Sequence, residues 1–391
     1  MLRIFLKKDR QAPVLRGHPW IFSGAIEKTD GDAETAGVAD IFDWRKNWIA
    51  RGLFSPKSQI RVRILTWENV PVDRAFFSGR LSQAVAFRAK FLSPTTNACR
   101  LINAEGDFLP GLIVDRYADF LVCQCLTSGM DAFKEEITEA LSRLLPVKGI
   151  FERSEGRVRD EEGLGASVGV LAGEEPPNLI SIEENQLKFL VDVRHGQKTG
   201  FFLDQRDNRH FLSAQTQGAT VLNCFSYSGA FSVYALSGGA TEVVSLDSSR
   251  PALELAEENL KLNGFATAGG ELLKADAFTY LKECQSAFDI IILDPPSLAR
   301  KRSDVAAATG GYKFLNLHAL RHLRPGGRLF TFSCSQHISF DLFQKIVFGA
   351  AVDAGRKVSV LKRLGPAIDH PVSLHHPEGE YLKGLALNVL D

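Results

Sequence analysis

Apolar segments alternate with helical segments throughout the second half of the chain. Each apolar segment has the length of a single strand, and a stretch with helical spacing follows it. Strands that are buried on both faces and joined by helices form a mostly parallel sheet with helices on both sides. The sequence therefore predicts a Rossmann-like, doubly wound α/β domain, with strands at residues 220–225, 242–247, 271–276, 288–294, 328–333 and 357–361.

Two further domains are expected before this one, because 391 residues exceed the length of an ordinary single domain. Residues 1–72 read as short strands separated by turns. The alternation in 59–65 places Val62 and two isoleucines on a core face, and it directs Arg61 and Arg63 outward. We therefore predict a small β-barrel domain at residues 1–72.

Residues 73–178 contain both helical spacing and strand-like alternation, and they are predicted to form a central α+β domain. Helical spacing covers 76–91 and 131–145, whereas 111–115 and 120–125 look like paired strands. Residues 173–178 break both periods and form a linker. The third domain, 179–391, is expected to begin with a hairpin of 187–193 and 200–203 and a polar helix at 204–215.

The composition favours a cytoplasmic protein. The chain has 46 basic and 46 acidic residues, so no overall charge draws it to a membrane or to long nucleic acid. Its six cysteines show no paired metal-ligand spacing, and their use fits a reducing compartment. No apolar run is long enough to span a bilayer. We expect neither a membrane segment nor a metal site.

Acidic residues end successive strands of the predicted sheet. The turn after the first strand contains only Gly229, so it lacks the three glycines that cradle a pyrophosphate. Asp247 can accept from a ribose diol, and Asp276 can accept from an exocyclic amine. Such a site suits a nucleoside ligand without phosphates, namely S-adenosylmethionine. The alternative is that these aspartates are only helix caps. The candidate cofactor contacts are Asn223, Phe225, Ser226, Tyr227, Gly229, Asp247, Asp276, Asp294, Pro295 and Gln205.

Cys334 follows the fifth strand, where open α/β sheets bind ligands. Carbon 5 of a pyrimidine becomes nucleophilic once a thiolate has added to carbon 6, and Cys334 is our candidate for that thiolate. An inert buried cysteine is the alternative. Asp294, in Asp294-Pro295-Pro296, is a second candidate catalytic residue. The base that removes the carbon-5 proton is expected to be Glu378, with Glu380 as the second choice.

Stretches along nearly the whole chain match one known family: residues 16–24, 50–52, 55–61, 111–116, 195–200, 203–207, 223–231, 311–313, 332–335, 369–372 and 380–384. Through them the chain resembles the bacterial 23S ribosomal RNA 5-methylcytosine methyltransferase family called large-subunit methyltransferase I. The resemblance implies an amino-terminal PUA domain, a central domain and a class I methyltransferase domain. It also implies S-adenosylmethionine as donor, Cys334 as nucleophile, and 23S ribosomal RNA or a large-subunit assembly intermediate as partner.

Basic residues lie beside aromatic residues in the amino-terminal domain, a combination that holds phosphates and stacks on unpaired bases. A second basic run follows Asp-Pro-Pro and could contact the backbone beside an extruded base. Ordinary solvated charges are the alternative, and Trp20 could instead be a core residue. The candidate RNA contacts are Arg16, His18, Trp20, Arg61, Arg63, Arg300, Lys301 and Arg302.

Other functions stay open from the sequence. A uridine-5 or base-amino methyltransferase would share the Asp-Pro-Pro turn, although Ser297 stands where amino methyltransferases carry an aromatic residue. A non-catalytic RNA-binding or ribosome assembly factor with a vestigial cofactor pocket is a third possibility. The modified nucleotide and homodimer formation are likewise undetermined.

Overall fold

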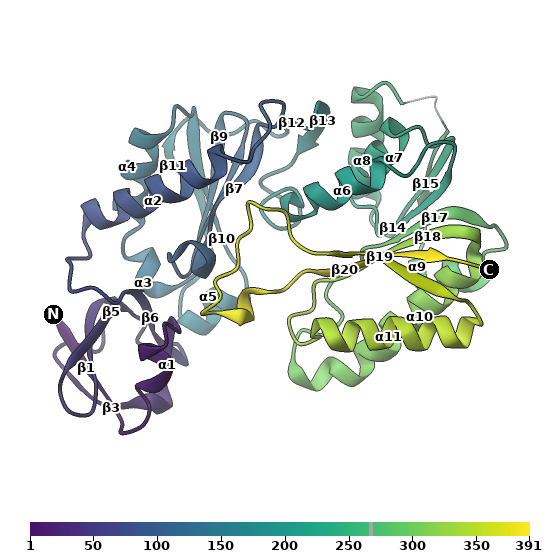
Figure 1. The fold of residues 1–391 in the computed structure, drawn as a ribbon. Coiled ribbons are helices and arrows are strands. Elements are labelled where there is room, and N and C mark those ends of the chain that lie inside the picture. The colour runs from purple at the N-terminus through teal and green to yellow at the C-terminus, as the bar shows by residue number, and fades with distance from the viewer. Residues whose placement is uncertain (266–268) are drawn as a thin grey trace. The chain divides into compact units, whose positions relative to one another are not determined.

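The computed structural model describes residues 1–265 and 269–391. The chain divides into two compact units (Figure 1). Unit 1 comprises Met1–Ile182, Val191–Leu203 and Ile368–Gly379, and unit 2 comprises Glu183–Leu190, Asp204–Ala367 and Glu380–Asp391. Within the described residues, no helix combines the length and apolar character needed to cross a bilayer.

The first sheet of unit 1 confirms the β-rich character predicted for the amino-terminal region. Its six strands lie in the order β2-β6-β5-β4-β1-β3, and Ile4, Ile41 and Val62 are fully buried in its core. The pair β1–β4 is parallel and the other pairs are antiparallel. The strands are β1 (Leu2–Leu6), β2 (Trp20–Phe22), β3 (Ile26–Asp30), β4 (Gly37–Phe42), β5 (Trp48–Phe54) and β6 (Ile60–Thr66), with the short helix α1 (Ala12–Leu15).

Arg63 does not point into solvent, contrary to the alternation. It is 7% exposed, and its guanidinium lies 2.9 Å from the carboxylate of Glu162, which is itself 2% exposed. Period 2 predicts which face of a strand a residue occupies, but it does not predict whether another element covers that face. Glu162, at the end of α5 (Arg157–Glu162), supplies the buried partner that Arg63 requires.

The second sheet of unit 1 belongs to the central region. Its strand order is β11-β10-β9-β8-β7, with β9 and β10 parallel and the remaining pairs antiparallel. Two helices, α2 and α4, share a core with it, as the helical spacing predicted. The elements are α2 (Arg74–Ala89), β7 (Ala98–Asn103), β8 (Leu112–Tyr117), β9 (Phe120–Cys125), α3 (Ser128–Asp131), α4 (Lys134–Leu144), β10 (Gly149–Ser154) and β11 (Ser167–Gly173).

Unit 2 contains the predicted doubly wound sheet. The strand order is β16-β15-β14-β17-β18-β20-β19, and β14 to β18 are parallel. The order reverses at β14, which lies between β15 and β17; such a reversal leaves a crevice at the carboxyl ends of the strands. The strands are β14 (Thr220–Cys224), β15 (Glu242–Asp247), β16 (Gly270–Lys274), β17 (Phe288–Leu293), β18 (Leu323–Ser333), β19 (Val358–Leu364) and β20 (Lys383–Val389).

Helices cover both faces of this sheet. Helices α6, α7 and α8 form one group, and α9, α10 and α11 form the other (Figure 1). The helix α8 has defined ends: the Ser249 hydroxyl accepts from the N–H of Ala252, and Asn263 is the C-cap. The helices are α6 (Arg206–Ser213), α7 (Ala230–Ser237), α8 (Arg250–Leu262), α9 (Ala277–Glu283), α10 (Val305–His322) and α11 (Phe340–Ala354).

In the predicted third domain, 179–391, one expectation was wrong and one strand was missed. Residues 200–203 form no strand; instead β13 (Leu187–Val191) forms a two-stranded sheet with β12 (Ile180–Glu184), because Asn185 and Gln186 adopt the left-handed conformation of a tight hairpin turn. The strand β20 was not among the strands predicted for this domain. This strand is antiparallel to both β18 and β19 and lies between them.

Candidate functional site

The turn between β14 and α7 is strained. Phe225, Tyr227 and Gly229 have φ values of +60°, +46° and +72°, so two non-glycine residues occupy the left-handed region. Strained backbone of this kind is concentrated at functional sites, where surrounding contacts hold it. A Cβ on Gly229 would lie 2.9 Å from the Cβ of Ala256, so glycine also permits close packing against α8. The turn is therefore specified by its tertiary contacts.

Asp247 holds this turn at the end of β15. Its carboxylate accepts from the backbone N–H of Tyr227 and from that of Ser249, both at 2.9 Å. The N–H of Ser226 donates to the carbonyl of Leu246 at 3.0 Å. Asp247 is only half-buried, so its carboxylate can accept further hydrogen bonds. It is thus more than a helix cap.

Two buried polar atoms beside the turn suit a polar ligand. Within residues 1–265 and 269–391, the Asn223 side-chain oxygen and the Ser226 hydroxyl have no hydrogen-bond partner. The Asn223 amide nitrogen donates to Ser232 at 2.9 Å, which leaves the oxygen to accept. Buried polar atoms normally have partners, so a ligand that supplies them fits this position. Together with Asp247, these residues suit the nucleoside and amino-acid groups of S-adenosylmethionine.

Asp276 behaves as a helix cap. Its carboxylate accepts from the N–H and the hydroxyl of Thr279, at 2.9 and 3.0 Å, at the start of α9. The side chain is exposed. The capping alternative therefore describes its contacts in the structure, and a cofactor contact from Asp276 stays a proposal.

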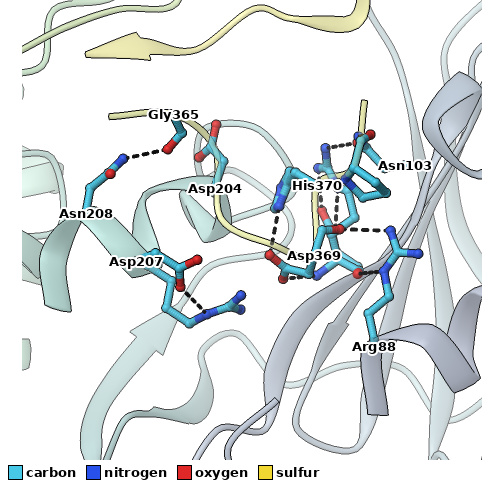
Figure 2. A network of polar contacts seen from close by, with 12 residues as sticks. Arg88, Asn103, Asp204, Asp207, Asn208, Gly365, Asp369 and His370 are labelled. Atoms are coloured by element: carbon cyan, nitrogen blue, oxygen red, sulfur yellow. Dashed lines mark hydrogen bonds and ion pairs between the residues drawn. The ribbon is translucent and has the colours of Figure 1, made fainter. Parts of the chain in front are cut away.

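Gln205 orients Asp294. The Gln205 amide donates to the Asp294 carboxylate at 3.0 Å, and the Gln205 oxygen accepts from Asn208 at 2.6 Å. Asn208 also donates to the carbonyl of Gly365, at 2.9 Å (Figure 2). Gln205 and Asn208 are buried, whereas Asp294 is half-buried. This chain of hydrogen bonds fixes the orientation of the Asp294 carboxylate at the end of β17.

Cys334 lies at the carboxyl end of β18, as predicted. It is half-buried, and its Sγ lies 3.8 Å from the carbonyl of Pro295, so the Asp-Pro-Pro turn and the thiol are neighbours. The next residue, Ser335, is held at its hydroxyl by Tyr312 at 2.9 Å and by the N–H of Ala299 at 3.1 Å. The backbone that carries the thiol is therefore well constrained.

Lys383 is a site residue that the sequence interpretation missed. It pairs with Ser333 in the β18–β20 register, and its Nζ donates to the carbonyl of Ser335 at 2.9 Å. The residue is 2% exposed. Burial lowers the pKa of Lys383 below its ordinary value, while Glu380 and Cys334 act in the opposite direction. The signal in the sequence was a lysine at the start of the apolar run 383–389.

Glu378 belongs to unit 1, whereas Cys334 and Glu380 belong to unit 2. Its carboxylate lies 3.5 Å from the Nε2 of His18 and 3.9 Å from that of His376. Burial by itself would raise the pKa of Glu378, but hydrogen bonding and His18 lower it below the ordinary value. The observed partners of Glu378 are thus histidines of its own unit.

The segment that carries Glu378 is bound to the central region of unit 1. The Asp369 carboxylate accepts from the N–H of Arg100 at 3.0 Å, and Arg88 donates to the Asp369 carbonyl at 2.8 Å. Asn103 donates to the carbonyl of Pro371 at 2.9 Å (Figure 2). His370 and Asp369 are both buried and in contact, at 3.0 Å. The stretch Ile368–Gly379 is therefore an integral part of unit 1.

The predicted RNA contacts of the amino-terminal domain have different environments. His18, Trp20 and Glu378 line a surface hollow of about 460 Å³. The Trp20 indole donates to Glu105 at 2.8 Å, and its ring centroid lies 4.4 Å from that of His376, so Trp20 is a packed, half-buried residue. Arg16 is exposed and Arg61 is half-buried. Arg63 is excluded from this set, because it is buried against Glu162.

The second basic run is accessible. Arg300, Lys301 and Arg302 are all exposed, and they lie in unit 2 between β17 and α10. The Asp304 carboxylate accepts from the backbone N–H groups of Arg300 and Lys301, at 3.2 and 2.9 Å. These hydrogen bonds shape the loop and leave the charged side chains at the surface.

Comparison with known proteins gives consistent results. Residues 154–356 match a family described as S-adenosylmethionine-dependent methyltransferase, and residues 4–67 match a PUA-like domain. The chain is 47% identical to ribosomal RNA large subunit methyltransferase I of Tolumonas auensis over 99% of both chains, and 43% identical to that of Escherichia coli over 100% of both.

Solved structures agree with the predicted fold class. A protein from Streptococcus mutans described as a SAM-dependent methyltransferase is 25% identical, with a TM-score of 0.85 over 100% of both chains. A methyltransferase crystallised in complex with SAH is 26% identical, with a TM-score of 0.86 over 100% of both chains. The prediction of a PUA-like domain and a methyltransferase domain is confirmed.

Proposed function

The chain belongs to the ribosomal RNA large subunit methyltransferase I family, and from this membership we propose that it methylates carbon 5 of a cytosine in 23S ribosomal RNA. The observation that carries the choice of carbon 5 is the position of Cys334, at the end of β18 and beside the Asp-Pro-Pro turn. S-Adenosylmethionine supplies the electrophilic methyl group.

Cys334 makes carbon 5 reactive. Its thiolate electron pair forms a bond to carbon 6, and the electrons of the 5,6 double bond become available at carbon 5. After carbon 5 has gained the methyl group, a base removes the carbon-5 proton. The electrons of that C–H bond restore the 5,6 double bond and expel the thiolate. The nucleophile is regenerated, and one proton has passed to the base.

Asp294 favours cytosine over uracil. A carboxylate accepts a hydrogen bond from the exocyclic amine of cytosine, whereas it repels the carbonyl oxygen that uracil carries at the same position. Gln205 donates a hydrogen bond to this carboxylate and so fixes its orientation at the end of β17. Ser297 hydrogen-bonds to Ser335 at 3.1 Å and offers no aromatic face for an amino methyltransferase.

The location of Glu380 in unit 2 favours it as the base. Glu380 and Cys334 lie in the same unit, and both interact with the charge of Lys383. Glu378, our first choice from the sequence, is already paired with His18 and His376. The two glutamates can be distinguished by replacing each with glutamine, since loss of the base alone traps the RNA on Cys334.

The cofactor lies beside the β14–α7 turn in this proposal. Asp247 accepts from the ribose, and Asn223 and Ser226 supply the buried polar atoms. RNA contacts the hollow at His18 and Trp20 and the basic run 300–302. Aromatic edges beside basic groups suit unpaired bases and phosphates. The substrate is 23S ribosomal RNA, either free or within an assembly intermediate.

Nucleoside mass spectrometry tests the proposal. Ribosomal RNA from a strain without the protein should lack one 5-methylcytidine, and wild-type protein should restore it. Cys334→Ala should restore none, yet bind S-adenosylmethionine with unchanged affinity. RNA carrying 5-fluorocytidine should form a covalent adduct with the wild-type protein and none with C334A. A methyl group on a base nitrogen or on uridine, or full activity of C334A, would contradict the proposal.

A further inference from the structure

We propose that Lys383 is the positioning residue that keeps Cys334 in its thiolate form. This inference deepens the proposed function, because it rests on Cys334 being the nucleophile. It assigns a role to a buried cation that no step above uses. The proposal stands on three observations: the register of β20, the burial of the ammonium group and the identity of the surrounding charges.

The register places Lys383 at the nucleophile. Strand β20 pairs with β18 so that Lys383 lies opposite Ser333, the residue before Cys334. The Lys383 Nζ donates to the carbonyl of Ser335, the residue after Cys334, at 2.9 Å. The ammonium group therefore contacts the short backbone stretch that carries the thiol. Strand β18 lies between β17 and β20, so strands pair with it on both sides.

Burial makes an anionic partner necessary. Lys383 is 2% exposed, and a buried ammonium group is unfavourable unless an anion lies nearby. The Ser335 carbonyl accepts a hydrogen bond but carries no net charge. The groups that favour the charged form of Lys383 are Glu380 and Cys334. The Lys383 ammonium group and a Cys334 thiolate thus stabilise each other.

Three other titratable groups border the pair. Glu380 precedes β20, and its negative charge also favours the charged form of Lys383. The Tyr312 hydroxyl, from α10, hydrogen-bonds to Ser335 at 2.9 Å, and burial raises its pKa, so it remains neutral. Asp294 precedes Pro295, whose carbonyl lies 3.8 Å from the Cys334 sulfur. Among these neighbours Lys383 carries the positive charge that favours a thiolate. The carboxylates of Glu380 and Asp294 carry negative charges that disfavour it.

The proton balance is simple. The Cys334 thiol gives its proton to solvent, and the sulfur keeps the electron pair as a thiolate beside the Lys383 ammonium. That electron pair then forms the bond to carbon 6. When the thiolate leaves at the end of the reaction, the same ammonium receives it in charged form. No oxidant, reductant or further reactant is required.

The test follows the alkylation of Cys334 by iodoacetamide as a function of pH, read by mass spectrometry of the Cys334 peptide in the full chain. Lys383→Met should lower the alkylation rate at pH 7 at least tenfold and move the pH midpoint upward. Lys383→Arg, which keeps the charge, should retain most of the rate. Lys345→Met, at an exposed lysine of α11, is the matched control and should change nothing.

An unchanged pH profile in folded Lys383→Met would overturn the proposal and leave Lys383 with a structural role at Ser335. If that variant does not fold, the wild-type protein still decides. Its thiolate absorbance, taken as the difference from Cys334→Ser, should titrate below the ordinary thiol value of about 8.5. A midpoint at or above that value would also overturn the proposal. Neither measurement uses RNA. A failure of the Lys383 proposal can therefore be distinguished from a failure of the proposed methyl transfer, which the RNA experiments test.

Discussion

The carboxylate of Asp247 accepts a hydrogen bond from the backbone N–H of Tyr227 at 2.9 Å, and so joins the end of β15 to the strained turn after β14. One side chain thereby shapes the turn and borders the position proposed for the cofactor. A substitution of Asp247 should therefore disturb both the conformation of the turn and the binding of the cofactor beside it.

Asp247→Ala should weaken S-adenosylmethionine binding by about 10- to 100-fold, because hydrogen bonds to a charged group contribute about 1.5–3 kcal/mol. Isothermal titration calorimetry measures the change. Asp276→Ala is the matched control, since Asp276 caps α9 through Thr279. It should lower the free energy of unfolding by about 1 kcal/mol. Equal losses of affinity in both variants would assign both aspartates to the cofactor.

Gly229→Ala should destabilise the protein more than Gly218→Ala. Both glycines have left-handed φ values, +72° and +71°, so both substitutions cost roughly 1–2 kcal/mol of backbone strain. Of the two positions, only Gly229 has a close neighbour: its new Cβ would lie 2.9 Å from the Cβ of Ala256. This overlap adds about 1–3 kcal/mol. Urea denaturation followed by circular dichroism compares the two, and equal midpoints would contradict the packing role of Gly229.

Arg63→Met should lower the free energy of unfolding by about 3–5 kcal/mol, because it leaves the buried Glu162 carboxylate without its cation. Arg61→Met should leave stability within about 0.5 kcal/mol and weaken RNA binding instead. Thermal denaturation and filter binding measure the two effects. A stable Arg63→Met variant with reduced RNA affinity would restore Arg63 to the RNA-binding surface.

Acid should remove part of this stability through Glu162. Burial raises the pKa of Glu162, but Arg63 and the hydroxyls of Ser58 and Ser55 lower it below its ordinary value of 4.5. The ionised form therefore stabilises the folded state above pH 4.5, and this contribution is lost as the pH falls through the folded pKa. Denaturation midpoints between pH 6 and pH 3 should fall less steeply for Arg63→Met/Glu162→Gln than for wild-type protein.

Local sequence determined most strands of the seven-stranded sheet and the acidic residues at the ends of β15 and β17. Each strand of the seven-stranded sheet except β20 overlaps a predicted strand, although β18 begins five residues earlier than predicted, because apolar segments between helices repeat along the chain. The position of Cys334 at the end of a strand followed from the same pattern. The sequence also placed Asp247 after β15 and Asp294 after β17, since chain order fixes which residue follows a parallel strand.

Tertiary structure alone decided which charged residues are buried and what they contact. Lys383 reaches the Cys334 backbone through a strand pairing that spans 50 residues, from Ser333 to Lys383, and no local period encodes such a pairing. Arg63 is buried because Glu162 covers it, and Glu378 faces His18 because the stretch Ile368–Gly379 belongs to unit 1. The free energy of a buried charge depends on its partner, and these partners are distant in sequence.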